Sequence, residues 1–297
     1  LCWGANPSYT QIPNAHFLTE ARYKGAEFIC ITPDYSATAR HADRWIPVKP
    51  GGDAALALGV AHILFAENLV DRAFVAEQTD LPMLVRDGTH RFLRAEDLEE
   101  GGSEDALYLH DPETGIVPAP TRSLALAGLN PSLEGRFEVT LRDGKKVGVR
   151  PVFELLREQL AIYTPEHAAE LSGTPAPQIR DLAHRLARAK AASMVTTSNF
   201  AKYYHGNLIE RTQALVFALT GNYGKKGSGF VGFPFLMHDG LDKFVLGAFG
   251  LGTRGLIGAF GLYEETRLQL AGFTDEMMIY ERSRKNFESG MECSGSL

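Results

Sequence analysis

The stretch Leu1-Cys2-Trp3-Gly4-Ala5-Asn6-Pro7 decides the fold, because it is a short apolar run that stops at a glycine and leads into a helical pattern. Apolar residues recur at helical spacing over residues 14–24, and a second apolar run covers residues 28–31. Strand, glycine-containing turn, helix and strand form the minimal right-handed crossover unit. We therefore expect an α/β protein with a Rossmann-like parallel sheet and flanking helices, in which the first turn opens a nucleotide site.

Two further segments place a carboxylate at a turn, Thr32-Pro33-Asp34-Tyr35-Ser36 and Pro50-Gly51-Gly52-Asp53. Asp34 follows the second expected strand, where a carboxylate can bind ribose hydroxyls, although an ordinary turn residue is the simpler interpretation of this aspartate alone. Asp53 opens the apolar segment 54–65 and is expected to be the N-cap of a helix. Its oxygens also match the adjacent N–H donors on the edge of guanine, so a guanine-reading role is chemically available.

The glycine pattern of the first turn argues against a nicotinamide site. Residues 4–8 lack the third glycine of the dinucleotide fingerprint, and Asp34 lies about thirty residues after the turn rather than about twenty. Two alternatives to a guanine-nucleotide enzyme stay open: a nicotinamide-dependent dehydrogenase, and a non-catalytic Rossmann-like module that binds a nucleotide.

Several segments resemble the catalytic (alpha) subunits of the dimethyl sulfoxide reductase superfamily. Within it they are similar to the branch of nitrate, selenate and chlorate reductases and of ethylbenzene and dimethyl sulfide dehydrogenases. The segments are residues 3–7, 15–25, 32–36, 42–43 and 50–56. The resemblance implies a molybdenum oxidoreductase that holds molybdenum bis(molybdopterin guanine dinucleotide). It also implies that this chain is mostly the third of four domains, the one that embraces one dinucleotide.

Site residues follow from the resemblance position by position. It implies that Gly4, Ala5 and Asn6 lie at the diphosphate or pterin side, Asp34 at ribose, and Gly52 and Asp53 at guanine. Many family members are expected to carry threonine where this chain has Gly52.

The second half of the chain repeats the strand, loop and helix pattern. A strand is expected over residues 194–197 and a helix over 208–219, so the loop 199–207 lies on the same side of a parallel sheet as the first turn. The resemblance adds Asn199, Tyr204, His205 and Gly206 to the cofactor-binding residues, near the pterin end. For His205 a simple hydrogen bond to the backbone is the alternative.

Turn and strand signals divide the chain into four parts. Residues 1–78 are expected to form the first half of the dinucleotide-binding domain and residues 151–235 its second half. Residues 79–150 form a β-rich insertion with hairpin signals at Asp87-Gly88 and Asp143-Gly144. Residues 236–297 form a glycine-rich connector and a truncated tail. In the segment 244–262 dense glycine and Arg254 argue against a membrane span.

Composition limits the function further. The chain has 297 residues, 44% of them hydrophobic, and its net charge of −6 argues against binding nucleic acid. Cys2, Cys30 and Cys293 form no metal-binding pair, so no metal ligand is assigned.

The parts of the enzyme that the sequence lacks are assigned through the resemblance alone. The catalytic residue is unknown, because the metal-ligating aspartate and an iron–sulfur cluster are expected upstream of Leu1. A fragment that is inactive alone is therefore expected. The resemblance implies a small-molecule substrate, with nitrate as the first candidate in anaerobic respiration. It also implies an iron–sulfur electron-transfer subunit as partner and a place on the periplasmic or cytoplasmic face of a membrane.

Overall fold

The computed structural model describes residues 1–120, 125–196 and 200–231, together with isolated helical positions between residues 252 and 270. Its main sheet has five strands in the order β10-β9-β1-β2-β3, and all four pairings are parallel. The strands are β1 (Cys2–Trp3), β2 (Ile29–Thr32), β3 (Arg44–Pro47), β9 (Ser193–Val195) and β10 (Gly229–Val231). The predicted Rossmann-like parallel sheet is therefore confirmed.

The strand order contains a switch point between β1 and β9. The chain starts in β1, moves outward through β2 and β3, and returns on the other side of β1 in β9 and β10. Loops that leave adjacent strands at such a point diverge to opposite sides, and ligands of open α/β sheets bind in the crevice that this leaves.

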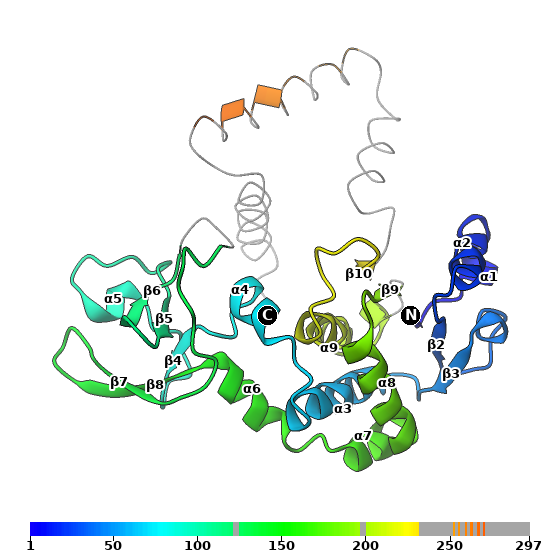
Figure 1. The fold of residues 1–297 in the computed structure, drawn as a ribbon, viewed down its shortest axis with the longest axis horizontal. Helices are drawn as coiled ribbons and strands as arrows, with labels where there is room; N and C mark the ends of the chain where they lie inside the picture. The colour runs from blue at the N-terminus through cyan, green and yellow to red at the C-terminus, as the bar shows by residue number, and fades with distance from the viewer. Residues whose placement is uncertain are drawn as a thin grey trace.

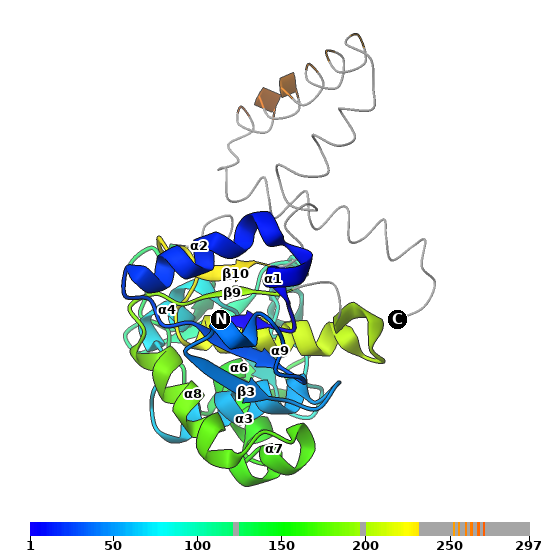
Figure 2. The same ribbon diagram turned by 90° about the vertical axis from the view of Figure 1, so that its right-hand side faces the viewer.

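Helices cover both faces of the sheet (Figures 1 and 2). On one face lie α1 (Pro7–Thr10) and α2 (Ile12–Tyr23), which connect β1 to β2. The other face carries α3 (Asp53–Ala66), α8 (Ala176–Arg188) and α9 (Gly206–Leu219), and α3 also packs on α7 (Pro165–Ser172). Figure 2 shows α2 and α3 on opposite sides of the strands.

Side chains alternate between the two faces of the sheet along each strand, and the hydrophobic core on one face is much larger than that on the other. Trp3, Ile31 and Ile46 face the helix layer around α3 and belong to the larger buried core, whereas Cys2 and Cys30 belong to a small cluster on the other face. Helix α3 is buried on most of its surface, as its uniformly apolar sequence requires.

Gly59 of α3 allows α7 and α8 to pack closely against this helix. A Cβ atom at Gly59 would lie 2.5 Å from the Cβ of Ala168, so a larger residue would push α7 away.

Two local predictions need correction. Gly52, not Asp53, is the N-cap of α3, because Asp53 is the first helical residue and its side chain accepts a hydrogen bond from the buried Trp3. The second concerns strand β3, which was not predicted. Its short apolar core is bounded by the charged residue Arg44 and by Pro47. The 3₁₀ helix η1 (Ala39–His41) links β2 to β3.

The region between β3 and β9 contains antiparallel strands (Figure 1). One sheet has the order β4-β8-β7, formed by β4 (Leu84–Arg86), β7 (Phe137–Thr140) and β8 (Lys146–Pro151); β5 (Tyr108–Asp111) pairs with β6 (Gly115–Pro118). The turn at Asp87-Gly88 forms, but β4 pairs along its length with β8 and makes only one bridge, Val85 to Phe92, across that turn.

Short helices flank these strands, namely α4 (Arg72–Gln78), α5 (Ala95–Leu98) and α6 (Val152–Leu160). Helix α7 begins after Thr164, whose Oγ1 accepts from the N–H of His167, and Pro165 lies in its first turn. None of the helices in the described ranges is long and apolar enough to cross a membrane. The glycine-rich segment 244–262 lies almost entirely outside the described residues.

Candidate functional site

The carboxyl ends of β1, β2, β3 and β9 carry the residues predicted to bind a cofactor. Parallel pairing brings these ends to one edge of the sheet. The turn after β1 contains Gly4 with φ +67°, and a Cβ atom there would lie 2.3 Å from Cζ of Phe200, in the loop after β9. The loop after β9 thus lies on the same side of the parallel sheet as the first turn, as expected, and its Phe200 approaches Gly4.

The turn after β1 is also tied to the loop after β2. Thr38 Oγ1 donates to Asn6 Oδ1 at 2.6 Å and accepts from the N–H of Ser8 at 3.1 Å. Because its side-chain oxygen is used in this way, Asn6 does not cap α1 with its side chain. Ala5 is buried beside it, and its carbonyl oxygen accepts from Cys2 Sγ at 3.2 Å.

Asp34 lies at the start of the loop after β2 with an exposed side chain. The backbone of this loop is ordered locally, since the carbonyl oxygen of Asp34 accepts from Thr32 Oγ1 at 2.8 Å and from the N–H of Ser36 at 2.9 Å. Tyr35 is exposed and packs edge-on against Trp45. The carboxylate of Asp34 is therefore presented to solvent by a fixed turn.

The turn after β3 is held by a segment far away in the chain. The N–H of Lys49 donates to the carbonyl oxygen of Ser172 at 2.7 Å, and Lys49 Nζ donates to that of Glu170 at 3.2 Å, both at the end of α7. Thr174 Oγ1 donates to the carbonyl oxygen of Pro47 at 2.6 Å. The end of α7 thus fixes the turn that leads into α3.

Gly52 has no room for a side chain in this arrangement. A Cβ atom at Gly52 would lie 2.9 Å from Cα of Ser172 and 3.1 Å from the carbonyl oxygen of Lys49. Both are backbone atoms, which cannot move aside as the end of a long side chain can. A threonine at this position would require a different approach of α7.

Asp53 is buried, with 4% of its surface exposed, at the first position of α3. Its Oδ1 accepts a hydrogen bond of 2.8 Å from Nε1 of Trp3, which is fully buried at the end of β1. Burial raises the pKa of Asp53 above its ordinary value, while the hydrogen bonds from Trp3 and from the backbone oppose this rise. The site therefore contains a carboxylate with little access to water and no ion-pair partner among the described residues.

The loop after β9 contributes both contacts and exposed groups. Tyr203 lies near Gly51, since a Cβ atom there would be 4.0 Å from Cδ1 of Tyr203. Tyr204 is 92% exposed and packs on the ring of His205, which has φ +55° and precedes buried Gly206 at the start of α9. Asn199, the remaining predicted residue, lies outside the described residues.

Thr196 was not predicted as a site residue. It follows β9 directly, is fully buried, and its Oγ1 has no hydrogen-bond partner among the described residues. A buried hydroxyl without a partner is unfavourable. Thr196 therefore adds a polar group at the switch point for which the described residues supply no hydrogen-bond partner.

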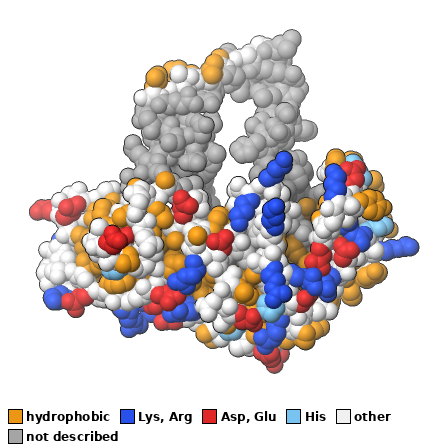
Figure 3. All heavy atoms as spheres, in the orientation of Figure 1, with side chains coloured by type: hydrophobic (Ala, Val, Ile, Leu, Met, Phe, Trp, Pro, Cys, Tyr) orange, Lys and Arg blue, Asp and Glu red, His pale blue; other side chains and the backbone are white. Residues whose placement is uncertain are grey.

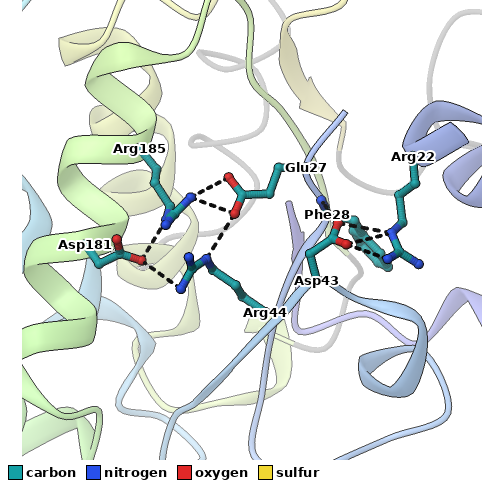
Figure 4. Close-up of polar contacts among 7 residues, drawn as sticks. All are labelled: Arg22, Glu27, Phe28, Asp43, Arg44, Asp181 and Arg185. Atoms are coloured by element: carbon teal, nitrogen blue, oxygen red, sulfur yellow. Dashed lines mark hydrogen bonds and ion pairs between the residues drawn. The ribbon is translucent and has the colours of Figure 1, made fainter. Parts of the chain in front are cut away.

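The opposite edge of the sheet, at the amino ends of β2 and β3, is closed by ion pairs (Figure 4). Glu27, just before β2, contacts Arg185 of α8 at 2.7 Å and Arg44 of β3 at 3.0 Å. Asp181 contacts Arg185 at 2.7 Å and Arg44 at 3.5 Å. This four-residue cluster, here called the amino-edge network, joins β3 to α8.

A second pair lies beside the amino-edge network (Figure 4). Arg22 of α2 forms an ion pair with Asp43, and Asp43 Oδ2 also accepts from the N–H of Phe28 at 2.8 Å. Arg22 and this N–H lower the pKa of Asp43, as Arg185 lowers that of Asp181. On the face shown in Figure 3, cationic and anionic side chains are interspersed.

The part of the chain that the structure describes contains no cluster of three or more His, Cys, Asp or Glu able to hold a metal ion. The groups gathered at the carboxyl edge are instead a buried carboxylate, a buried hydroxyl, glycine turns and the N-terminus of the long helix α3. These groups can accept and donate hydrogen bonds to a nucleotide.

Comparison with known proteins agrees with this geometry. A sequence model of the family described as "Molybdopterin oxidoreductase" matches residues 1–255. The perchlorate reductase subunit alpha of Dechloromonas aromatica is 40% identical over 256 residues, which cover 77% of this chain and 28% of the relative. The dimethylsulfide dehydrogenase subunit alpha of Rhodovulum sulfidophilum is 38% identical over 229 residues, covering 75% of this chain and 25% of the relative.

A relative named for another activity aligns over a similar fraction of this chain. The respiratory nitrate reductase subunit alpha of Haloferax mediterranei is 34% identical over 246 residues, covering 77% of this chain and 25% of the relative. The chain thus spans about a quarter of the length of these curated relatives.

Proposed function

The chain belongs to the molybdopterin oxidoreductase family, and we propose that it forms the part of a catalytic subunit that binds one molybdopterin guanine dinucleotide. Asp53 carries this proposal, because it is a buried acceptor at the N-terminus of α3 that lacks a cationic partner among the described residues. The N1–H and N2–H groups of guanine are two adjacent donors, and a carboxylate can accept both. We assign guanine to Asp53 and the adjoining Gly52.

The other carboxyl-edge residues fit the rest of a dinucleotide. The turn of Gly4, Ala5 and Asn6 lies at the switch point and suits the diphosphate or pterin side. Thr196, whose hydroxyl has no partner among the described residues, lies there too. Exposed Asp34 suits the ribose hydroxyls. Tyr204, His205 and Gly206, with Asn199, are proposed to line the pterin end.

We also propose domain boundaries that fit this assignment of the cofactor-binding residues. Residues 1–78 and 151–235 would form one dinucleotide-binding unit, with residues 79–150 as an insertion and residues 236–297 as a connector and tail.

This chain's own contribution to the reaction is binding and orientation. The bound molybdenum cofactor supplies the redox chemistry that moves oxygen or hydroxyl to or from a substrate. The turn held by α7 and the buried carboxylate fix the guanine end. Rigid support of one end limits the positions available to the other end, where the substrate reacts.

The activity of the whole subunit is proposed from its relatives. Their names give perchlorate, chlorate, nitrate and dimethylsulfide as compounds on which similar subunits act. We propose nitrate reductase-like reduction of an oxyanion as the first activity to assay. We further propose that an iron–sulfur cluster of the catalytic subunit and a separate iron–sulfur subunit carry the electrons.

The test is metal and nucleotide analysis of the intact enzyme purified under anaerobic conditions. Molybdenum is measured by mass spectrometry, and nucleotides released by acid hydrolysis are separated by chromatography. We expect about two GMP for each molybdenum, as the bis form of the cofactor implies. Adenine nucleotides would favour the nicotinamide alternative, and GMP without molybdenum would favour a non-catalytic nucleotide-binding module.

A further inference from the structure

Trp3 and Asp53 meet across the buried interior between the sheet and α3. The indole nitrogen donates to Oδ1 at 2.8 Å, and the two residues are 50 positions apart in the chain. Trp3 is fully buried at the end of the central strand, and Asp53 begins the helix that packs over the same face. The Asp53 carboxylate therefore receives a hydrogen bond from the interior of the protein, through the indole N–H of Trp3.

The direction of this hydrogen bond leaves one side of the carboxylate free. Trp3 shares its face of the sheet with Ile31 and Ile46, beneath α3, so its indole reaches Asp53 from the core. Each carboxylate oxygen has two acceptor positions; the indole uses one of the four, and the backbone of Asp53 and Gly51 also contributes hydrogen bonds. No described side chain other than Trp3 donates to this carboxylate, so we expect a ligand to approach it from the side of the turn containing Gly51 and Gly52.

Resting on the proposed binding of guanine by Asp53, we infer that Trp3 is a positioning residue for guanine. Its indole N–H fixes the orientation of the Asp53 carboxylate so that the free acceptor positions face the ligand.

Two physical effects give the indole this influence. A buried carboxylate that loses a hydrogen-bond donor is poorly solvated, and burial already raises the pKa of Asp53. A protonated carboxyl would present a donor where guanine also presents donors. In addition, without the indole the carboxyl group is free to rotate about its last bond, so the two acceptors no longer keep a fixed geometry.

The test compares Trp3→Phe with wild type in the intact, cofactor-loaded enzyme. Phenylalanine keeps an aromatic ring in the core but removes the N–H donor. The readout is the rate at which guanine nucleotide leaves the protein during dialysis, measured as GMP remaining after acid hydrolysis. We expect release of the cofactor, followed as the joint loss of GMP and molybdenum, to become about 10-fold faster, as loss of a hydrogen bond to a charged group predicts.

Trp45→Phe is the matched control. Trp45 Nε1 donates to the carbonyl oxygen of Thr32 at 3.2 Å, so this variant also loses an indole hydrogen bond near the carboxyl edge, but not one to Asp53. We expect GMP release from this variant to stay within about twofold of wild type. If Trp3→Phe does not fold, benzothienylalanine at position 3 replaces the N–H by sulfur and keeps the bicyclic shape.

A double-mutant cycle with Asp53→Asn separates positioning from general loosening of the core. If Trp3 acts through the carboxylate, Trp3→Phe should accelerate release much less in the Asp53→Asn background than in wild type. Equal acceleration in both backgrounds, or wild-type release from Trp3→Phe while Asp53→Asn releases GMP quickly, would overturn the inference and leave the proposed function intact. Wild-type release from both single variants would overturn the guanine role of Asp53 itself.

Discussion

The two edges of the parallel sheet use acidic side chains in opposite ways. At the amino edge, Glu27, Asp43 and Asp181 each contact an arginine, and the pKa values of Asp43 and Asp181 are lowered by those contacts. At the carboxyl edge, Asp34 and Asp53 form no ion pair with a described residue, and burial raises the pKa of Asp53. Carboxylates whose charge is already compensated contribute to the fold, whereas those left without a partner are available to a ligand.

The largest effect is expected from Asp53→Asn in the intact enzyme. The amide keeps an acceptor for Trp3 but presents a donor to guanine and loses the negative charge. Release of the cofactor, and with it the guanine nucleotides, should become about 10- to 100-fold faster, in line with about 1.5–3 kcal/mol for a hydrogen bond to a charged group. Chromatographic GMP analysis during dialysis measures this, and Asp34→Asn is the matched carboxylate control.

Asp53→Asn should also leave the cofactor-free protein as stable as wild type, or more stable, at neutral pH. A carboxyl group with a raised folded-state pKa favours folding most below its unfolded-state pKa, and this contribution is lost as the pH rises through the folded-state pKa. The variant's advantage should therefore shrink as the pH is lowered. Thermal unfolding between pH 5 and 8 checks this, and a clearly less stable variant at pH 8 would show that Asp53 serves the fold.

Gly52→Ala is expected to come next, because the added methyl group would meet the backbone of Ser172 and Lys49. Overpacking of this kind costs about 1–3 kcal/mol of unfolding free energy. Denaturant unfolding should show the loss, and GMP release should accelerate because the turn after β3 moves. Gly255→Ala is the control, because a Cβ atom there would meet nothing within 4 Å. A normal GMP release rate from Gly52→Ala would mean that the guanine site does not depend on this turn.

Asp34→Ala should have a smaller effect on the nucleotide. Its carboxylate is exposed, so water can replace the ribose hydroxyls as partners, and we expect release to accelerate only about 2- to 5-fold. Unfolding free energy should be unchanged, because no described residue pairs with this side chain. An effect as large as that of Asp53→Asn would show that burial does not distinguish the two carboxylates.

The smallest effect is expected at the amino edge, from Arg185→Gln. Its contacts with Glu27 and Asp181 are partly exposed, and such pairs contribute about 0.2–1 kcal/mol each. The loss should diminish in high salt and as the pH falls below the ordinary pKa of aspartate, since Asp181 has a lowered pKa and stabilises the fold only when ionised. Guanine release at neutral pH should remain at the wild-type rate; faster release would break the separation of the two edges.

The sequence predicts the carboxyl edge better than the contacts that support it. The unit formed by β1, α2 and β2 depends on patterns within a few tens of residues, and its turns are therefore visible in the sequence. The hydrogen bond between Thr174 and Pro47 joins residues 127 positions apart, and no local sequence pattern predicts it. Strand β3 was missed because its short apolar core is bounded by Arg44 and Pro47.

Trp3 and Asp53 show the same limit within the site. A buried tryptophan is expected to find an acceptor for its N–H, so a partner for Trp3 could have been anticipated. Which acceptor it finds depends on how α3 packs over the sheet. The N-cap prediction for Asp53 was wrong for the same reason. Gly52 is the N-cap, and the Asp53 carboxylate accepts from the buried indole of Trp3.

The most direct test is an experimental structure of the intact, cofactor-loaded enzyme in which the guanine nearest Asp53 is resolved. The account predicts that N1 and N2 of one guanine lie about 2.7–3.2 Å from the Asp53 carboxylate oxygens, with the Trp3 hydrogen bond retained on the other side. A guanine bound elsewhere, with Asp53 still buried and contacted only by Trp3, would contradict it.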